Sequence, residues 1–387
     1  MATVALVLAA AAAMAAAVLV VPACAELPQV EHAPKDDGTL AILAVGDWGR
    51  RGQFNQTLVA EQCPRLGYSQ WRVSSRGFLE CHVITDIVYT RMRLRLPVQS
   101  FIAQFHKLFM AQIHRLSISF ILMMGVVGEK LDIDFVISTG DNIYDDGIAN
   151  TSDPLFKECF TNIYTAQSLQ KPWYIVLGNH DYTGNALAQQ DPAIRDVDSR
   201  YLSVAKSFIV NAEIADFFLV DTSPFILKYW NDTKFDWREV APRDTFIENL
   251  LKDLDSALTE SKAAWKIVVG HHPISSGCEH GNTTELEQLL LPILKTHGVD
   301  IYLNGHDHCL QHISSRDSPL QLLTSGGGSK AWAGKFKDTS DKIEFLYDGQ
   351  GFMSMQLSKT EANLTFYDVA GSVLHSWGTS KAAPAGL

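Results

Sequence analysis

The stretch Leu40-Ala41-Ile42-Leu43-Ala44-Val45-Gly46-Asp47-Trp48-Gly49 sets the pattern for this chain of 387 residues. A short apolar run ends at a glycine and is followed at once by an acidic side chain. Apolar runs bounded by glycine predict strands that are buried on both faces. The acidic residue then lies at the carboxyl end of its strand, which is where open α/β sheets bind ligands.

The same arrangement returns four times further along the chain. Apolar runs lead into Gly140-Asp141-Asn142-Ile143-Tyr144, Gly178-Asn179-His180-Asp181, Gly270-His271-His272 and Gly305-His306-Asp307-His308. A single Asp after Gly is usually only a turn. Five polar patches, each ending an apolar run, predict instead that several strands deliver their side chains to one crevice. We therefore expect an α/β fold with a site built from all five loops.

The polar patches supply enough side chains to hold two metal ions. Anionic oxygens suit hard ions, whereas imidazole suits divalent transition metals. Asp141 is central among the oxygen donors and is the natural bridging ligand. A tyrosine ligand must lose a proton with an ordinary pKa of about 10, which calls for a strongly acidic ion such as Fe(III). The predicted ligands are Asp47, Asp141, Tyr144, Asn179, His271, His306 and His308.

Two further histidines, His180 and His280, are predicted to contact the substrate rather than a metal. Beside two metal ions, an unligated His can bind a phosphate oxygen or protonate a leaving group. The alternative for His280 is an ordinary surface residue. The glycine-rich run 325–329 is predicted to form a turn at the rim of the crevice. The residues predicted to be structural or to orient their neighbours are His272, His297, His312, Asp181 and Asp307.

No serine nucleophile motif accompanies these histidines, so water is the expected nucleophile. Two metal ions about 3.5–4 Å apart can activate water and clamp the attacking and leaving oxygens of an in-line displacement. Phosphate ester hydrolysis is the reaction class that this arrangement suits. The net charge of −11 argues against non-specific binding of nucleic acid.

The N-terminus predicts a secreted protein. Residues 2–21 are almost entirely Ala, Val, Leu and Met, and Pro22-Ala23-Cys24-Ala25 offers small residues for cleavage. We expect a signal peptide over residues 1–25, although about 20 apolar residues could also remain as a membrane anchor. Removal of residues 1–25 leaves five cysteines, whose pairing the sequence does not determine. The sequons that fit secretion are Asn55, Asn150, Asn231, Asn282 and Asn363.

Residues 63–123 differ from the rest of the chain. They hold eight Lys and Arg side chains against two acidic ones. Residues 54–62 and 124–131 read as two pieces of one amphipathic helix, which this segment interrupts. Three interpretations compete: a functional insertion such as a lid or membrane contact, a disordered loop, and translated non-coding sequence. The basic, weakly patterned composition and the position inside a helix favour the third.

With these motifs in place, the chain resembles the metallophosphoesterases, and specifically the small, plant-like purple acid phosphatases. The match comprises GDWG, GDNIY, GNHD, VVGH and GHDH, and the tyrosine of GDNIY separates this family from its relatives. The resemblance implies two mixed β-sheets packed as a sandwich and flanked by helices. It also implies a single catalytic domain over residues 26–387, interrupted by residues 63–123, with strands near 352–357, 363–369 and 372–377 in the second sheet.

The resemblance further assigns the metals. It implies Fe(III) on Asp47, Tyr144 and His308, with Asp141 as the bridge. A divalent Fe, Zn or Mn ion would bind the remaining ligands, and His180 and His280 would contact the substrate. The ligands of the divalent ion would be Asn179, His271 and His306, together with Asp141.

We therefore expect a secreted acid phosphatase, extracellular or vacuolar, that hydrolyses small phosphate monoesters by attack of a metal-bound hydroxide. It is expected to be a monomer without a stable membrane span once the signal is cleaved. One alternative is a phosphodiesterase or nucleotide hydrolase on the same scaffold, which Tyr144 disfavours. The other is an isoform that residues 63–123 have made inactive.

Overall fold

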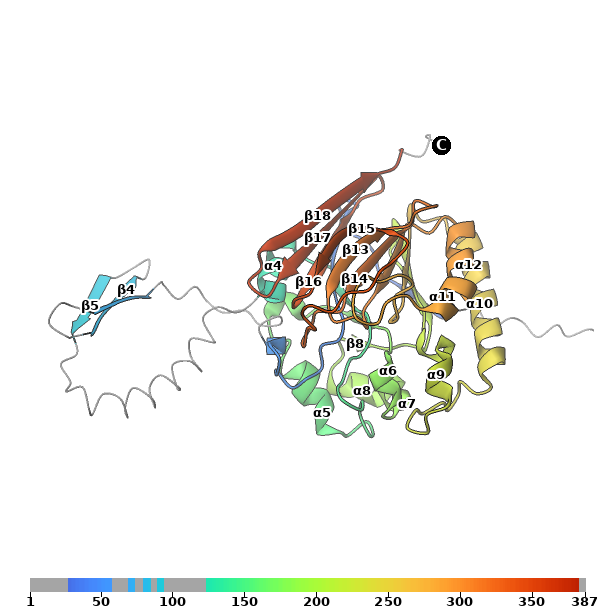
Figure 1. Cartoon of the computed structure of the whole chain (residues 1–387), viewed down its shortest axis with the longest axis horizontal. Coiled ribbons are helices and arrows are strands. Elements are labelled where there is room, and N and C mark those ends of the chain that lie inside the picture. Colours follow the sequence, from blue (N-terminus) through green and yellow to red (C-terminus); the bar gives the residue numbers. More distant parts are fainter. Residues whose placement is uncertain (1–26, 58–68, 74–78, 85–88, 94–122, 383–387) are drawn as a thin grey trace, which may run out of the picture.

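The computed structural model describes residues 27–57, 69–73, 79–84, 89–93 and 123–382, and it is built on two large mixed sheets (Figure 1). The predicted signal peptide lies outside the described residues. The eight-stranded sheet has the order β1 (Gln29–Glu31), β9 (Phe208–Asn211), β10 (Ala215–Leu219), β11 (Trp265–Val269), β12 (Ile301–Asn304), β14 (Gln321–Ser325), β13 (Leu310–Ser314) and β15 (Lys342–Tyr347). The seven-stranded sheet has the order β18 (Val373–Ser380), β17 (Glu361–Asp368), β16 (Gly351–Leu357), β2 (Leu40–Val45), β6 (Phe135–Ser138), β7 (Trp173–Ile175) and β8 (Tyr201–Leu202).

The two sheets pack face to face over a shared core. Alternate residues of β2 point in opposite directions, because side chains of a strand alternate between its faces. Ile42 and Ala44 join the core between the sheets, where Phe217 and Ile267 of the eight-stranded sheet also lie. Leu43, on the other face of β2, joins a second buried cluster. Both faces of β2 are therefore covered, which explains why its sequence is apolar without interruption.

Helices cover the outer faces of both sheets. Ile247, Leu250 and Leu254 of α10 recur at helical spacing and pack on Val268 and Tyr302 of the eight-stranded sheet. Helix α4 covers the other sheet from the opposite side of the molecule (Figure 1). The predicted sandwich flanked by helices is thus confirmed. The helices are α4 (Met123–Leu131), α5 (Pro154–Phe156), α6 (Asn179–Tyr182), α7 (Ala186–Gln190), α8 (Pro192–Val197), α9 (Leu227–Trp230), α10 (Arg243–Glu260), α11 (Thr284–Leu289) and α12 (Leu291–Thr296).

Within each sheet, the strands that carry the polar patches are parallel to one another. Strands β2, β6 and β7 are adjacent in the seven-stranded sheet, and β11 and β12 are adjacent in the other. All five loops therefore leave the carboxyl ends of their strands. The predicted C-terminal strands also exist, as β16, β17 and β18. They extend the sheet that contains β2, since β16 pairs directly with β2.

The helix predicted to start at residue 54 begins later. Phe54 and Asn55 have φ angles of 51° and 60°, which α-helical residues do not adopt. The first helical residue is Gln56, whose side chain accepts hydrogen bonds from the amides of Arg50 and Gly52. Residues 58–62 lie outside the described part of the chain.

Within residues 63–123 the structure describes three short strands and the first residue of α4. The strands β3 (Ser69–Val73), β4 (Leu79–Ile84) and β5 (Tyr89–Arg93) form a small antiparallel sheet of their own. None of the described strands in the two large sheets pairs with β3, β4 or β5. The parallel pairing of β2 with β6 is complete without this segment.

Candidate metal centre

The structure brings the seven predicted ligand side chains together at the junction of the two sheets. The oxygen donors come from loops after β2, β6 and β7, and the imidazoles come from loops after β11 and β12. We name the first group the oxygen half and the second group the imidazole half. The oxygen half comprises Asp47, Asp141, Tyr144 and Asn179. The imidazole half comprises His271, His306 and His308.

Three groups converge on the hydroxyl of Tyr144. Its Oη lies 2.9 Å from Asp47 Oδ1, 2.9 Å from Asp141 Oδ2 and 3.1 Å from His308 Nε2. A phenol carries one proton and can donate only one strong hydrogen bond. Several lone pairs therefore face the same point, which is the arrangement that a cation would satisfy.

A second group converges on His271. Its Nε2 lies 3.4 Å from Asp141 Oδ1, 3.3 Å from Asn179 Oδ1 and 3.2 Å from His306 Nδ1. Asp141 therefore turns Oδ2 toward Tyr144 and Oδ1 toward His271. One carboxylate faces both groups, as a bridging ligand would.

Backbone carbonyls fix the orientation of two imidazole rings. His271 Nδ1 lies 2.9 Å from the carbonyl oxygen of Thr139, and His308 Nδ1 lies 2.5 Å from that of Lys330. A carbonyl only accepts hydrogen bonds, so each Nδ1 carries the proton. Each Nε2 therefore faces the site, which is how metal-binding histidines are commonly held.

The charges of the site also fit cations. Burial raises the pKa of Asp47 well above its usual value, and the nearby Asp141 adds to this effect. Burial opposes the charge on His271, but Asp141 and Asp47 outweigh it and raise its pKa to about 9. The protein alone thus recruits a proton to balance its buried carboxylates, and metal ions would supply that positive charge instead.

Tyr144 would not ionise without such help. Burial, followed by the charges of Asp141 and Asp47, raises the pKa of its hydroxyl well above 10. The guanidinium of Arg50 lies 3.6 Å from the centre of the Tyr144 ring and 2.9 Å from an oxygen of Asp145. Arg50 is a neighbour of the centre that the sequence did not single out, because it lies just outside the GDWG motif.

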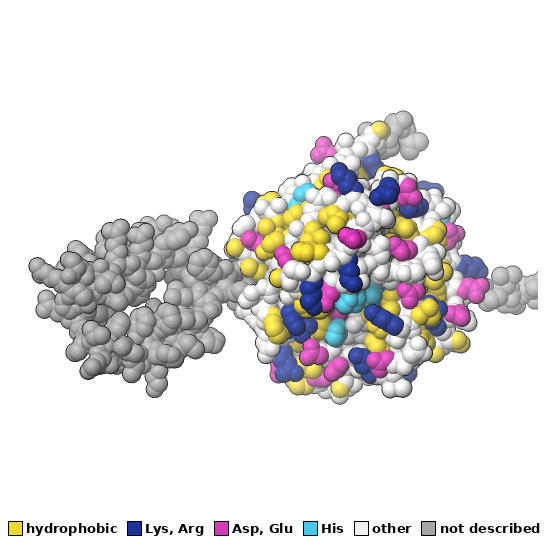
Figure 2. Space-filling view, viewed as in Figure 1, with side chains coloured by type: hydrophobic (Ala, Val, Ile, Leu, Met, Phe, Trp, Pro, Cys, Tyr) yellow, Lys and Arg dark blue, Asp and Glu magenta, His cyan; other side chains and the backbone are white. Residues whose placement is uncertain are grey.

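The two predicted substrate histidines lie at the surface beside this centre. The ring of His180 points Nε2 toward Asp141 at 3.9 Å, and its Nδ1 contacts the carbonyl oxygen of Asp145. His280 is exposed, and its ring stacks on His306 with centroids 4.1 Å apart. Figure 2 shows histidines at the surface of this face, with Lys and Arg side chains around them.

The remaining predicted roles also have structural counterparts. Asp181 accepts hydrogen bonds from the amides of Asn142 and Gly178, so it ties two oxygen-half loops together. Asp307 Oδ1 accepts the amide of His280 at 2.8 Å. His272 lies close to His271 and His306. However, its ring nitrogens face Thr222 Oγ1 at 3.0 Å and Tyr229 Oη at 3.1 Å, as expected of a structural residue.

A disulfide joins two loops of the imidazole half. Cys278 and Cys309 are bonded, so the loop of His280 is tied to the residue that follows His308. Of the other cysteines with described side chains, Cys159 is free and buried. The sequence did not indicate this pairing, because 31 positions separate the two partners.

The glycine-rich run 325–329 is buried, and the prediction that it lies at the rim is wrong. Gly326 leaves no room for a side chain, because a Cβ there would collide with the carbonyl oxygen of Asp307. Gly178 is equally confined, since its Cβ would overlap Asp141. These glycines let the loops approach closely enough for the ligands to meet.

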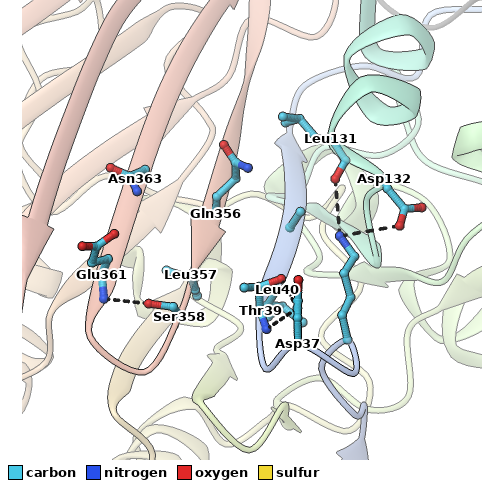
Figure 3. A pocket seen from close by; sticks show the side chains of 12 residues that line it. Asp37, Thr39, Leu40, Leu131, Asp132, Gln356, Leu357, Ser358, Glu361 and Asn363 are labelled. Atoms are coloured by element: carbon cyan, nitrogen blue, oxygen red, sulfur yellow. Dashed lines mark hydrogen bonds and ion pairs between the residues drawn. The ribbon is translucent and has the colours of Figure 1, made fainter. Parts of the chain in front are cut away.

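A cavity of about 480 Å³ at the surface lies away from this centre. It opens at the start of β2, near Leu40, whereas Asp47 follows the end of that strand. Lys35 on its wall already contacts the carbonyl oxygen of Leu131 and the carboxylate of Asp132 (Figure 3). None of the predicted site residues lines this cavity.

A family model described as calcineurin-like phosphoesterase matches residues 106–310, which is more than half of the chain. The match spans the patches from Asp141 to His308 and starts after Asp47. The solved structure of GAP50, the anchor in the inner membrane complex of Plasmodium, has a TM-score of 0.61 at 20% identity and covers 90% of each chain. That likeness concerns the fold alone. Fold and site thus define a calcineurin-like phosphoesterase.

Two plant relatives identify a more specific family within the calcineurin-like phosphoesterases. Purple acid phosphatase 3 of Arabidopsis thaliana is 49% identical over 358 residues, covering 91% of this chain and 81% of that protein. Purple acid phosphatase 4 of the same plant is 46% identical over 361 residues, covering 92% and 88%. The chain belongs to the purple acid phosphatase family. It is therefore an acid phosphatase, and its family implies a dinuclear metal centre.

Proposed function

We propose that this protein hydrolyses phosphate monoesters at an Fe(III) ion paired with a divalent Fe, Zn or Mn ion. The convergence of donors on Tyr144 carries the proposal. One ion would bind Asp47, Tyr144 and His308, and Asp141 would bridge to the second. The ligands of the second ion would be Asn179, His271 and His306, together with Asp141.

The tyrosine supports Fe(III) in the first position. Burial raises the pKa of Tyr144, so only a strongly acidic ion would convert it to phenolate in the acid range. The two ions, when bound, would supply Lewis acidity and an activated water for in-line attack on phosphorus. The chain itself would hold the ligands in register and exclude bulk water from them, since Asp47, His271 and His308 are all buried.

His180 and His280 would contact the phosphate or its leaving group. The Nδ1–H of His180 donates to the carbonyl oxygen of Asp145, which leaves Nε2 to face the centre. His280 has no hydrogen-bond partner for its ring nitrogens among the described residues, so they are free for the substrate. A protonated ring at either position would neutralise phosphate charge and could return a proton to the departing oxygen.

The disulfide supports secretion. Disulfides persist in oxidising compartments, so the Cys278–Cys309 bond agrees with the predicted signal peptide. Among the helices of the described residues, none combines the length and the hydropathy that a membrane span requires. A mature chain over residues 26–387, extracellular or vacuolar and monomeric, is part of the same proposal.

Tyr144→Phe tests the metal assignment. The loaded wild-type protein should be purple through a tyrosinate-to-Fe(III) transition, and the variant should lose that absorption while keeping most of its fold. A purple Tyr144→Phe protein would refute the role of Tyr144.

Substrate pairs test the reaction. The wild type should cleave an aryl phosphate monoester faster than the matching diester, with an optimum below pH 7. A preference for the diester would favour the phosphodiesterase alternative. A folded, metal-loaded protein without either activity would favour the inactive isoform.

A further inference from the structure

His280 differs from His180 in what orients its ring. Its backbone amide donates to Asp307, but among the described residues no hydrogen bond reaches either ring nitrogen. An imidazole turns about a broad torsion when nothing holds it. The orientation of this ring must therefore come from packing. One face stacks on His306 at 4.1 Å and 21°, and Trp332 meets the ring edge-on at 5.1 Å and 76°.

Trp332 is itself placed by His308. The two rings are nearly parallel, with centroids 4.0 Å apart and an angle of 11°. The carbonyl oxygen of Lys330, two residues earlier, accepts the Nδ1 proton of His308. The segment 330–332 therefore contacts His308 along both its edge and its face. Since His308 is fixed and buried, the indole has a firm base from which to contact His280.

We propose that Trp332 is a positioning residue for phosphate hydrolysis. It transmits the fixed position of His308 to His280 and holds that ring with its free nitrogens toward the substrate. The inference rests on the proposed function, because it takes His280 to be a substrate contact. A displacement of about 1 Å at a reacting group can cost about 10²-fold in rate, so the loss of this contact should be visible in kcat.

Three variants separate positioning from folding. Trp332→Ala should lower kcat by about 10²-fold, with KM and metal content close to those of the wild type. Trp332→Phe keeps a planar ring and should restore most of kcat. Trp377→Ala is the matched control, because Trp377 meets His312 edge-on at 5.3 Å on β18, outside the metal centre. Its kcat should not change. If Trp332→Ala is insoluble, Trp332→Leu replaces it.

A double-mutant cycle with His280→Ala supplies the decisive comparison. If Trp332 acts through His280, then Trp332→Ala should change kcat by less than about 3-fold in the His280→Ala background. An equal fold-loss in both backgrounds would overturn the inference. Loss of metal in proportion to kcat would also overturn it, since Trp332 would then serve only His308.

The single variant His280→Ala separates the substrate role of His280 from the positioning role of Trp332. A wild-type kcat for His280→Ala would refute the substrate role in the proposed function. A large loss in His280→Ala, combined with additive effects of Trp332→Ala, would leave that role standing and refute only the positioning role of Trp332.

Discussion

The oxygen half and the imidazole half of the site are held by different kinds of interaction. In the oxygen half, hydrogen bonds link neighbouring loops of one sheet, as when Asp181 accepts the amides of Asn142 and Gly178. In the imidazole half, hydrogen bonds from His271 and His308 to backbone carbonyls are joined by ring contacts and a disulfide. Hydrogen bonds between loops thus hold the first half, whereas the second half depends also on ring packing and on a covalent bond. Substitutions in the two halves should therefore impair the site in different ways.

Asp141→Asn should have the largest effect, because Asp141 faces both halves. Removing its charge should abolish metal binding and reduce activity below detection. Metal analysis and activity on an aryl phosphate would measure this. Asp216→Asn is the control, since Asp216 on β10 is also buried but accepts a hydrogen bond from Ser261 at the end of α10, away from the centre. Retention of both metals by Asp141→Asn would show that Asp141 is not the bridge.

His180→Ala should lower kcat by roughly 10²–10⁴-fold if the ring is a proton donor. The metal content should stay near that of the wild type, because His180 lies outside the seven proposed ligands. Parallel measurement of kcat and bound metal would check this. Equal losses of metal and activity would make His180 a metal ligand instead.

Deletion of residues 63–123 should improve folding and metal binding in the oxygen half. This segment separates Asp47 from Asp141, although β2 and β6 pair directly. The closure entropy of a long loop costs little, about 0.6 kcal/mol for each doubling of its length. The damage should come instead from interrupting the predicted helix, of which α4 is the second piece. Soluble yield, metal content and specific activity should rise together. A folded but inactive deletion would identify the segment as a functional lid, and equal activity would identify it as a tolerated excursion.

His375→Phe should have the smallest effect, a change in the pH dependence of stability at the contact between the two sheets. His312 Nδ1 of the eight-stranded sheet lies 3.1 Å from His375 Nε2 of the other sheet. Burial lowers the pKa of both rings, although Glu344 opposes the shift at each of them. Their stabilising contribution is therefore complete above the unfolded pKa of about 6.5 and is lost as the pH falls below it.

The variant should remove part of this pH dependence. Phe keeps the stacking of residue 375 on Phe345, whose ring lies 4.9 Å from that of His375, but it cannot titrate. The fall in Tm between pH 7.5 and pH 5 should be smaller in His375→Phe than in the wild type by a few degrees. Identical slopes would show that this His pair does not respond to acid.

Much of the oxygen half could be predicted from the sequence, because its signals are local. The apolar run before Asp47 has to be a buried strand, and so does the run before Asp141. Two such strands in a parallel pair place their following residues side by side. The meeting of Asp47, Asp141 and Tyr144 follows from that geometry together with the three-residue spacing of GDNIY.

The interactions that hold the imidazole half could not be predicted in the same way. A lone Trp in a loop carries no periodic signal, so nothing linked Trp332 to His308 or to His280. The Cys278–Cys309 bond depends on the packing of two distant loops. The run 325–329 looks like a turn from its composition, and only its contacts with Asp307 and with the strand end at Gly46 show that it is buried.

The confined glycines have a consequence for how this protein tolerates sequence variation. At Gly178 and Gly326 the space for a single methyl group is already occupied by Asp141 and by the backbone of Asp307. Neither glycine performs chemistry, yet an alanine at either position would push apart the loops that carry the ligands. In a systematic substitution map, these positions should therefore be as intolerant as the ligands themselves. The closeness of the loops therefore extends the constraint of the centre to residues that bind nothing themselves.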